Sequence, residues 1–159
     1  MVCLGNICRS PTAEGVLRFQ LQAKGLQDLV HVDSAGTSDW HEGEAPDPRS
    51  IRHAAARGYD LSTQRSRPIV MTDFHLHDYI LAMDKQNLRD LQRRCPPELQ
   101  SKLGLLLSFT AASTDQVPDP YEQQQAAFEE VLDLCEQASA ALIAHLVAKH
   151  RLQPAGGMA

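Results

Sequence analysis

Apolar positions recur with helical spacing in two long segments of the chain. Between residues 11 and 24 the apolar face consists of Ala13, Val16, Leu17 and Leu21, and Gly25 can end the helix. Near the C-terminus a longer stripe predicts one long helix, and it is made of Phe128, Val131, Leu132, Cys135, Ala138, Leu142 and Leu146. Two shorter helices are expected, one from Asp47-Pro48 to Gly58 and one over residues 85–94 before Pro96-Pro97.

Short apolar runs alternate with these helices. Val30–Val32, Tyr79–Met83 and Leu103–Leu107 predict buried strands. Strands that alternate with helices favour an α/β fold, a small doubly wound sheet of parallel strands with helices on both faces. Ligands of such folds bind at the carboxyl ends of the strands. The loops that follow the strands are therefore the place to look for functional residues.

Length, composition and charge narrow the class of protein. The 159 residues, 43% hydrophobic and 22% charged, suit one globular domain over residues 1–150 with a flexible tail at 151–159. A net charge of −5 argues against nucleic-acid binding. We expect no signal peptide, no membrane span and no disulfide framework from the four cysteines, and hence a cytoplasmic protein. Nothing in the sequence indicates an oligomeric state.

The candidate chemistry lies at the start of the chain. Cys3 and Arg9 are separated by five residues, among them Gly5 and Asn6, which both tolerate a positive φ and can turn backbone N–H groups around an anion. Ser10 suits a helix N-cap and Pro11 the first helical position, so a helix N-terminus adds its positive field. The pattern predicts a phosphate-binding loop in which Cys3 is a thiolate nucleophile. It lacks the lysine of nucleotide-binding loops, so ATP and GTP are not implied.

The run Cys3–Pro11, with Thr12–Glu14 after it, resembles the signature of the low-molecular-weight protein tyrosine phosphatases. Two distant segments, Asp33–Thr37 and Val117–Tyr121, match the family in order and spacing. The resemblance implies about four parallel strands with the phosphate-binding loop after the first. It also implies hydrolysis of phosphotyrosine or aryl phosphate esters through a cysteinyl-phosphate intermediate. The expected partners are phosphotyrosine-containing proteins or small aryl phosphates, and no cofactor or metal is expected.

The resemblance also implies a role for each site residue. Cys3 attacks phosphorus, Arg9 grips the phosphate oxygens, and Asp119 protonates the leaving group and then activates water. Ser10 supports the thiolate, Asn6 and Ser34 hold the loop, and Trp40 and Tyr121 form walls for a phenyl ring. The backbone of the loop supplies the remaining phosphate contacts, from Leu4, Gly5, Asn6, Ile7 and Cys8.

Several alternatives stay open at this point. Arsenate reductases share the fold but need a relay pair of cysteines, and only Cys95 lies in the relevant part of the chain. An arginine phosphatase branch favours Thr where Ile7 stands, and Ile7 suits a phenyl ring better. A phosphate-binding module without turnover would not need Cys3, Arg9 and Asp119 together. Cys8 is either a small buried hydrophobe or a resolving thiol that traps oxidised Cys3 as a disulfide.

The beginning of the chain departs from the family. Only Met1 and Val2 precede Cys3, whereas the family places a buried strand of about five residues there. Because two residues are too few for that strand, we expect the natural chain to begin upstream. For these 159 residues we expect a gap in the sheet beside Val30–Asp33 and Tyr79–Met83, and a loosely held Cys3 loop.

Overall fold

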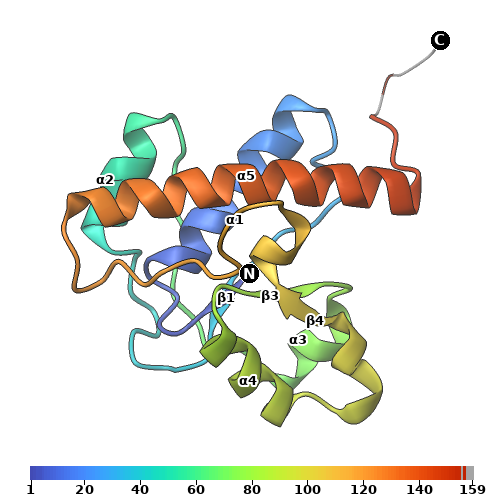
Figure 1. The fold of residues 1–159 in the computed structure, drawn as a ribbon, viewed down its shortest axis with the longest axis horizontal. Helices are drawn as coiled ribbons and strands as arrows, with labels where there is room; N and C mark the ends of the chain where they lie inside the picture. The colour runs from blue at the N-terminus through green and yellow to red at the C-terminus, as the bar shows by residue number, and fades with distance from the viewer. Residues whose placement is uncertain (155, 157–159) are drawn as a thin grey trace.

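A four-stranded parallel sheet with the order β2-β1-β3-β4 forms the centre of the computed structural model, which describes residues 1–154 and 156. This confirms the predicted α/β class. The strands are short, and the helices supply most of the structure (Figure 1). The elements are β1 (Val2–Cys3), α1 (Arg9–Ala23), β2 (Ala35–Gly36), α2 (Pro48–Ala56), α3 (Met71–Leu76), β3 (Ile80–Ala82), α4 (Lys85–Arg94), β4 (Leu103–Leu105) and α5 (Gln125–His150), with 3-10 helices at Pro97–Lys102 and Leu106–Phe109.

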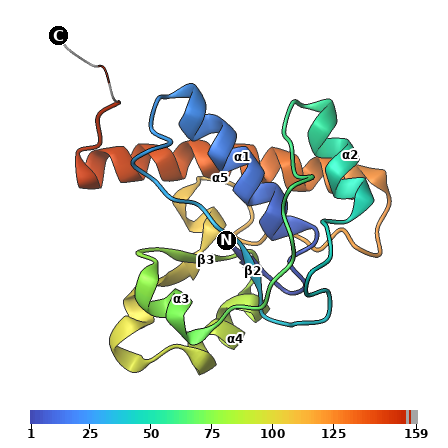
Figure 2. The same ribbon diagram turned by 180° about the vertical axis from the view of Figure 1, so that it is seen from behind.

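Helices cover both faces of the sheet, as predicted. On one face α1 and α5 enclose the larger apolar cluster, which includes Val16, Leu132 and Cys135 (Figure 1). On the other face Phe74 of α3 and Leu91 of α4 pack with Val2, Ile80 and other strand residues (Figure 2). By length and composition α5 could also cross a membrane, but half of its most apolar stretch is buried inside the molecule. Its apolar stripe therefore forms the core of this domain.

The predicted strand at Val30–Val32 is wrong. The strand in this part of the chain is β2, which begins at Ala35. A strand needs a hydrogen-bonded neighbour, and β1, the neighbour of β2, pairs only through Val2 and Cys3. Residues 30–32 lie upstream of that pairing and have no strand beside them. The predicted strand at Leu103–Leu107 is also too long, because the chain turns into a 3-10 helix at Leu106.

Strand β1 consists of two residues, Val2 and Cys3, and it pairs on both sides. Val2 lies opposite Ala35 on one side and Ala82 on the other, so a central strand is present, although it is shorter than the five residues that the family resemblance implied. The predicted gap is present, however. A cavity of about 620 Å³ continues the line of β1 beyond Met1 and is lined by residues including Val30, Asp33 and Tyr79.

The last part of the chain returns toward the core. Arg151 ends α5 in the left-handed region with a φ of 53°. Leu152 then packs against the larger apolar cluster. Residues 155 and 157–159, which belong to the expected flexible tail, lie outside the described residues.

Candidate active site

The loop that follows β1 leads directly into α1. Asn6 has a φ of 56°, which an asparagine tolerates better than most residues. Gly5, the other residue expected at positive φ, does not adopt it. A Cβ at this position would lie 3.0 Å from Cδ2 of His41, so the imidazole ring would have to shift to make room for it. The conformation leaves the loop wrapped around the sulfur of Cys3.

Cys3 lies at the bottom of this loop and its sulfur has two polar neighbours. The backbone N–H of Asn6 donates to Sγ at 3.2 Å, and Oγ of Ser10 lies 3.1 Å from Sγ. Both groups can donate a hydrogen bond to the sulfur. Ser10 was expected to cap α1, but the helix begins at Arg9 without a side-chain cap. The hydroxyl of Ser10 instead faces the thiol.

A second set of contacts holds the loop from behind. Nδ2 of Asn6 donates to Oγ of Ser10 at 2.7 Å and to Oγ of Ser34 at 3.0 Å. Its Oδ1 accepts from the backbone N–H of Arg67 at 3.0 Å. Asn6 is 2% exposed, and each polar atom of its side chain is used. The expectation of a loosely held loop is therefore wrong, since side chains anchor the loop where the strand is short.

The neighbouring strand also approaches the loop closely. At Gly36, in β2, a Cβ would lie 2.8 Å from the carbonyl oxygen of Leu4. Real Cβ atoms do not come that near to backbone oxygen, so a side chain here would push the loop aside. The backbone N–H of Ser38 donates to the same oxygen at 3.0 Å.

Arg9 is the first residue of α1, and its buried side chain lies beside the loop that holds Cys3. Its Nη1 donates to Oδ2 of Asp84 at 2.6 Å and to the carbonyl oxygen of Val117 at 3.1 Å. Its Nη2 lies 3.6 Å from Oδ2 of Asp119. Burial alone disfavours its charge, but Cys3 and the two carboxylates raise the pKa of Arg9 above its ordinary value. A permanently charged guanidinium therefore faces the loop.

Sequence reasoning missed Asp84 as a site residue. Asp84 follows β3 and caps α4, where its Oδ1 accepts from the backbone N–H of Asn87 at 2.7 Å. Its second oxygen holds Arg9. The available signal was an acidic residue directly after the predicted strand Tyr79–Met83, at the end of the sheet where ligands bind.

Asp119 and the two aromatic residues line the mouth of the site. Asp119 Oδ1 accepts from the backbone N–H of Tyr121 at 3.1 Å, which fixes the carboxyl group over the loop. Trp40 and Tyr121 are 70% and 47% exposed, so both rings are available to a substrate. The hollow between them has a volume of about 110 Å³ and is lined by Cys3, Leu4, Gly5, Ile7, Cys8, Arg9, Trp40, His41, Asp119 and Tyr121.

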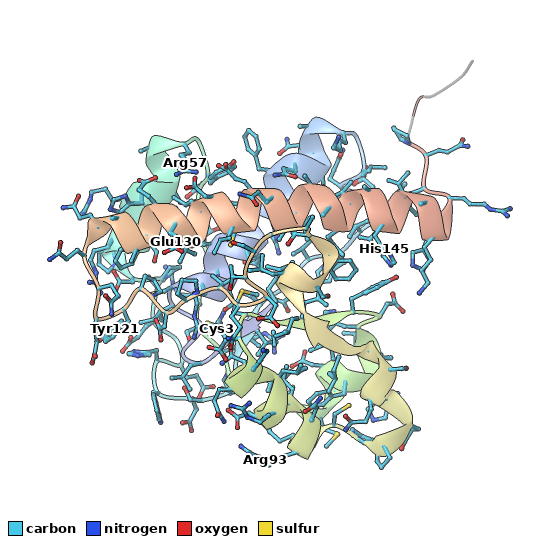
Figure 3. All side chains as sticks on the ribbon, in the orientation of Figure 1. Cys3, Arg57, Arg93, Tyr121, Glu130 and His145 are labelled. Atoms are coloured by element: carbon cyan, nitrogen blue, oxygen red, sulfur yellow. The ribbon has the colours of Figure 1, made fainter. Side chains whose placement is uncertain are left out.

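Two further residues support the mouth and were not predicted. Arg49 donates to the carbonyl oxygen of Tyr121 at 2.8 Å, and its guanidinium lies over the Tyr121 ring at 5.6 Å. His41 pairs with Glu44 at 2.8 Å and lines the hollow beside Gly5. In the view of Figure 3, Cys3 and Tyr121 both lie below the N-terminal half of α5.

Cys8 lies in the same loop but in an apolar environment. Together with Ile7 it packs against Phe128 of α5. Burial raises the pKa of the Cys8 thiol to about 12. At neutral pH Cys8 is therefore a protonated thiol, unlike a residue prepared for nucleophilic attack.

The structure brings together every site residue that the sequence predicted. Cys3, Arg9 and Asp119 meet at one hollow, and Asn6, Ser10 and Ser34 form the support behind it. Among residues 1–154 and 156, no group of three or more His, Cys, Asp or Glu side chains is arranged to hold a metal ion. The arrangement can surround a small anion with backbone N–H groups and a guanidinium, and present it to a thiol.

Comparisons with known proteins agree with this geometry. Residues 1–152 match the family model described as low molecular weight phosphotyrosine protein phosphatase. A low molecular weight protein-tyrosine-phosphatase of Streptomyces coelicolor is 44% identical over 147 residues, covering 90% of this chain and 89% of the relative. A putative one from Synechocystis is 42% identical over 147 residues, with 91% and 93% covered.

Solved structures give the same result. The crystal structure of a protein tyrosine phosphatase from Entamoeba histolytica, with Hepes in its active site, superposes with a TM-score of 0.89 at 41% identity. The match covers 95% of this chain and 96% of that one. Sequence, fold and site agree, and the chain belongs to the low molecular weight phosphotyrosine protein phosphatases, which hydrolyse phosphotyrosine with a cysteine nucleophile.

Proposed function

We propose that Cys3 is the nucleophile and Arg9 the phosphate-binding residue of this phosphatase. The observation that carries the proposal is the position of the Cys3 sulfur, which accepts from the Asn6 N–H at 3.2 Å at the bottom of the loop. A phosphate placed above it meets the loop N–H groups and the helix N-terminus. The buried Arg9 guanidinium supplies a fixed positive charge that can hold two phosphate oxygens.

The reaction then has two steps with Asp119 in both. Sγ of Cys3 forms a bond to phosphorus while the bond from phosphorus to the phenol oxygen breaks, and protonated Asp119 gives its proton to that oxygen. In the second step water attacks phosphorus, its proton passes to the Asp119 carboxylate, and the sulfur–phosphorus bond breaks. Asp119 suits this role because its carboxyl group lies at the mouth, tied to the Tyr121 backbone.

Ser10 acts on the thiolate in the second step. Its hydroxyl lies 3.1 Å from Sγ of Cys3 and can donate to the sulfur as it leaves. Asn6 and Ser34 are positioning residues, because their contact at 3.0 Å holds the loop without facing the substrate. The backbone N–H groups of Leu4 to Cys8 stabilise the equatorial oxygens of the transition state.

The substrate class follows from the walls of the hollow. Trp40 and Tyr121 offer two exposed aromatic rings, and the rim therefore suits a phenyl phosphate that reaches down to Cys3. Phosphotyrosine side chains of proteins and small aryl phosphates both have this shape. The net charge of −5 argues against nucleic acid as a partner, and we place the enzyme in the cytoplasm without membrane association.

One assay tests these assignments. Purified enzyme is given an aryl phosphate, phosphoserine, phosphoarginine and arsenate in turn, with EDTA present and no added metal. We expect turnover of the aryl phosphate alone. Cys3→Ser should abolish it while leaving the folded structure, since Ser is close in size. Retained turnover in Cys3→Ser, or a preference for phosphoarginine, would contradict the proposal.

A further inference from the structure

The loop that carries Asp119 has no regular secondary structure of its own. It runs from the end of the 3-10 helix at Phe109 to the start of α5 at Gln125, and within residues 110–124 the structure contains neither helix nor strand. In Figure 1 its orange part passes below the N-terminal half of α5. The Asp119 side chain is 47% exposed. Packing alone therefore does not fix the carboxyl group, and its position depends on contacts at the two ends of the segment 117–121.

One end of that segment is held by the core. Val117 is fully buried, and its backbone N–H donates to the carbonyl oxygen of Met83 at 2.8 Å. Its own carbonyl oxygen accepts from Nη1 of Arg9 at 3.1 Å. The prolines at 118 and 120 then restrict the backbone on both sides of Asp119. Because the segment has few free rotations, one further contact at Tyr121 is enough to decide where the carboxyl group lies.

Arg49 supplies that contact from α2. Its Nη2 donates to the carbonyl oxygen of Tyr121 at 2.8 Å. The backbone N–H of Tyr121 in turn donates to Oδ1 of Asp119 at 3.1 Å. The guanidinium also lies over two rings, 5.6 Å from the centre of the Tyr121 ring and 4.7 Å from that of Phe128. Arg49 therefore holds both the backbone and the ring of the residue that orients Asp119.

Arg49 is itself fixed to the phosphate-binding loop. Its Nε donates to Oδ1 of Asp47 at 3.0 Å and its Nη2 to Oδ2 at 2.8 Å, which is the two-pronged geometry of a strong ion pair. Asp47 is 8% exposed, and its backbone N–H donates to the carbonyl oxygen of Ile7 at 2.7 Å. The hydrogen bonds from Arg49 lower the pKa of Asp47, so the pair stays charged at neutral pH. A chain of contacts therefore joins the phosphate-binding loop to Asp119 through Asp47, Arg49 and Tyr121.

This connection matters because proton transfer is sensitive to distance. A general acid has to lie within hydrogen-bond reach of the leaving oxygen, and a displacement of about 1 Å can cost about a hundredfold in rate. The leaving oxygen is attached to the phosphate, and the loop holds the phosphate. The distance between the loop and the carboxyl group of Asp119 is therefore the quantity that must stay constant, and Asp47 and Arg49 span it.

We propose that Arg49 is a positioning residue for Asp119. Through the ion pair with Asp47 and the backbone of Tyr121 it holds the carboxyl group over the phosphate-binding loop, a role that rests on the proposed function of Asp119 as general acid. The competing role for Arg49 is direct binding of the substrate. The contacts favour positioning, because Nε and Nη2 are already used by Asp47 and Tyr121, which leaves only Nη1 for a substrate.

The test measures kcat/KM for a series of aryl phosphates whose phenols differ in pKa, because kcat/KM covers the reaction up to the departure of the phenol. Arg49→Met removes the donors but keeps a long apolar side chain beside the two rings. It should lower kcat/KM about tenfold or more for poor leaving groups, and by no more than about twofold for the ester of the most acidic phenol.

Arg52→Met is the matched control. Arg52 is exposed on the same helix and forms no hydrogen bond or ion pair with any of residues 1–154. Because nothing ties it to the loop of Asp119, Arg52→Met should give the same kcat/KM as wild type for every ester of the series.

A double-variant cycle tests whether Arg49 acts through Asp119. If it does, adding Arg49→Met to Asp119→Asn should change kcat/KM by less than about twofold for poor leaving groups, although each change alone is harmful. Asp47→Asn should reproduce part of the loss, since asparagine keeps the cap of α2 but not the charge. Arg49→Lys should fall between wild type and Arg49→Met, because lysine keeps a donor but cannot form the two-pronged pair. Melting temperatures show which variants fold, and Arg49→Lys and Asp47→Asn carry the cycle if Arg49→Met does not.

Three results would overturn the positioning role while the proposed function stands, because Asp119→Asn alone still shows its dependence on the leaving group. Equal losses across the series in Arg49→Met would show that Arg49 binds substrate or supports the fold in general. Losses that add in the double variant would show that it acts independently of Asp119. Unchanged kinetics of Arg49→Met would show that the acid needs no such support. If Asp119→Asn itself shows no dependence on the leaving group, the proposed role of Asp119 fails, and the positioning role of Arg49 fails with it.

Discussion

Arg9 and Asp84 are 75 residues apart in the chain, and Nη1 of one lies 2.6 Å from Oδ2 of the other. Arg9 has a 3% exposed side chain, so this contact fixes a buried guanidinium whose position determines where a phosphate can bind. Asp84 also caps α4, which ties the anion site to the carboxyl end of β3.

Asp84→Asn should lower kcat/KM for aryl phosphates by about ten- to hundredfold, the usual worth of a hydrogen bond to a charged group. Asparagine remains a good helix cap, so the melting temperature should change little. Asp115→Asn is the matched control, because Asp115 forms an exposed ion pair with Lys85 at 3.2 Å. Equal kinetics of Asp84→Asn and wild type would show that Arg9 does not need this anchor.

Asp119→Asn should reduce turnover by roughly 10²–10⁴-fold for esters with poor leaving groups. The loss should be much smaller for an ester whose phenol has a low pKa, because such a phenolate leaves without a proton. A series of aryl phosphates with graded leaving groups gives the dependence. A uniform loss across the series would exclude Asp119 as the general acid.

Peroxide should inactivate the enzyme, and a thiol reductant should restore it. An oxidised Cys3 can be trapped as a Cys3–Cys8 disulfide, in which the sulfenic oxygen leaves as water. Because the pKa of Cys8 is raised to about 12, trapping should accelerate as pH rises. Cys8→Ser should keep its activity but recover less after oxidation. Cys95→Ser, in the smaller apolar cluster, should recover like wild type.

Glu14 makes stability depend on pH. It is 3% exposed, and burial raises its pKa to about 6 from 4.5, although Arg18 opposes the shift. Between these values the folded state holds the proton more tightly than the unfolded state, so the free energy of unfolding falls as pH rises through this window. The shift corresponds to roughly 2 kcal/mol.

Glu14→Gln should therefore be about as stable as wild type at pH 4 and about 2 kcal/mol more stable at pH 8, by urea unfolding. Glu130→Gln, on the exposed side of α5, serves as the control and should follow wild type at both values (Figure 3). A constant difference between Glu14→Gln and wild type across the pH range would contradict this account.

Local sequence was enough to predict the loop and the main helices. Cys3 and Arg9 lie within seven residues of each other, so their spacing alone placed thiol and guanidinium at one helix N-terminus. The apolar stripe from Phe128 to Leu146 predicted α5 because a helix needs no distant partner for its hydrogen bonds. The family resemblance, rather than any local pattern, supplied Asp119 and Ser34.

The errors occurred where distant residues decide the structure. Val30–Val32 has a strand-like composition but lies upstream of the pairing between β1 and β2. Asp84 could not be assigned from its neighbours, since its partner Arg9 belongs to another element. Helix α3 has six residues, too few for a periodic pattern, and it begins where Asp73 accepts from the backbone N–H of Val70 at 2.9 Å.

The pairing of Val2 with Ala35 and Ala82 has a consequence for how the protein is made. Residues 2–9 leave the ribosome well before several of their partners, because β1 waits for β3 and Arg9 waits for Asp84 and Val117. Parallel pairing across such distances is slow. During synthesis Cys3 therefore remains an ordinary exposed thiol, and it gains the surroundings of the proposed nucleophile only after most of these residues have emerged and folded.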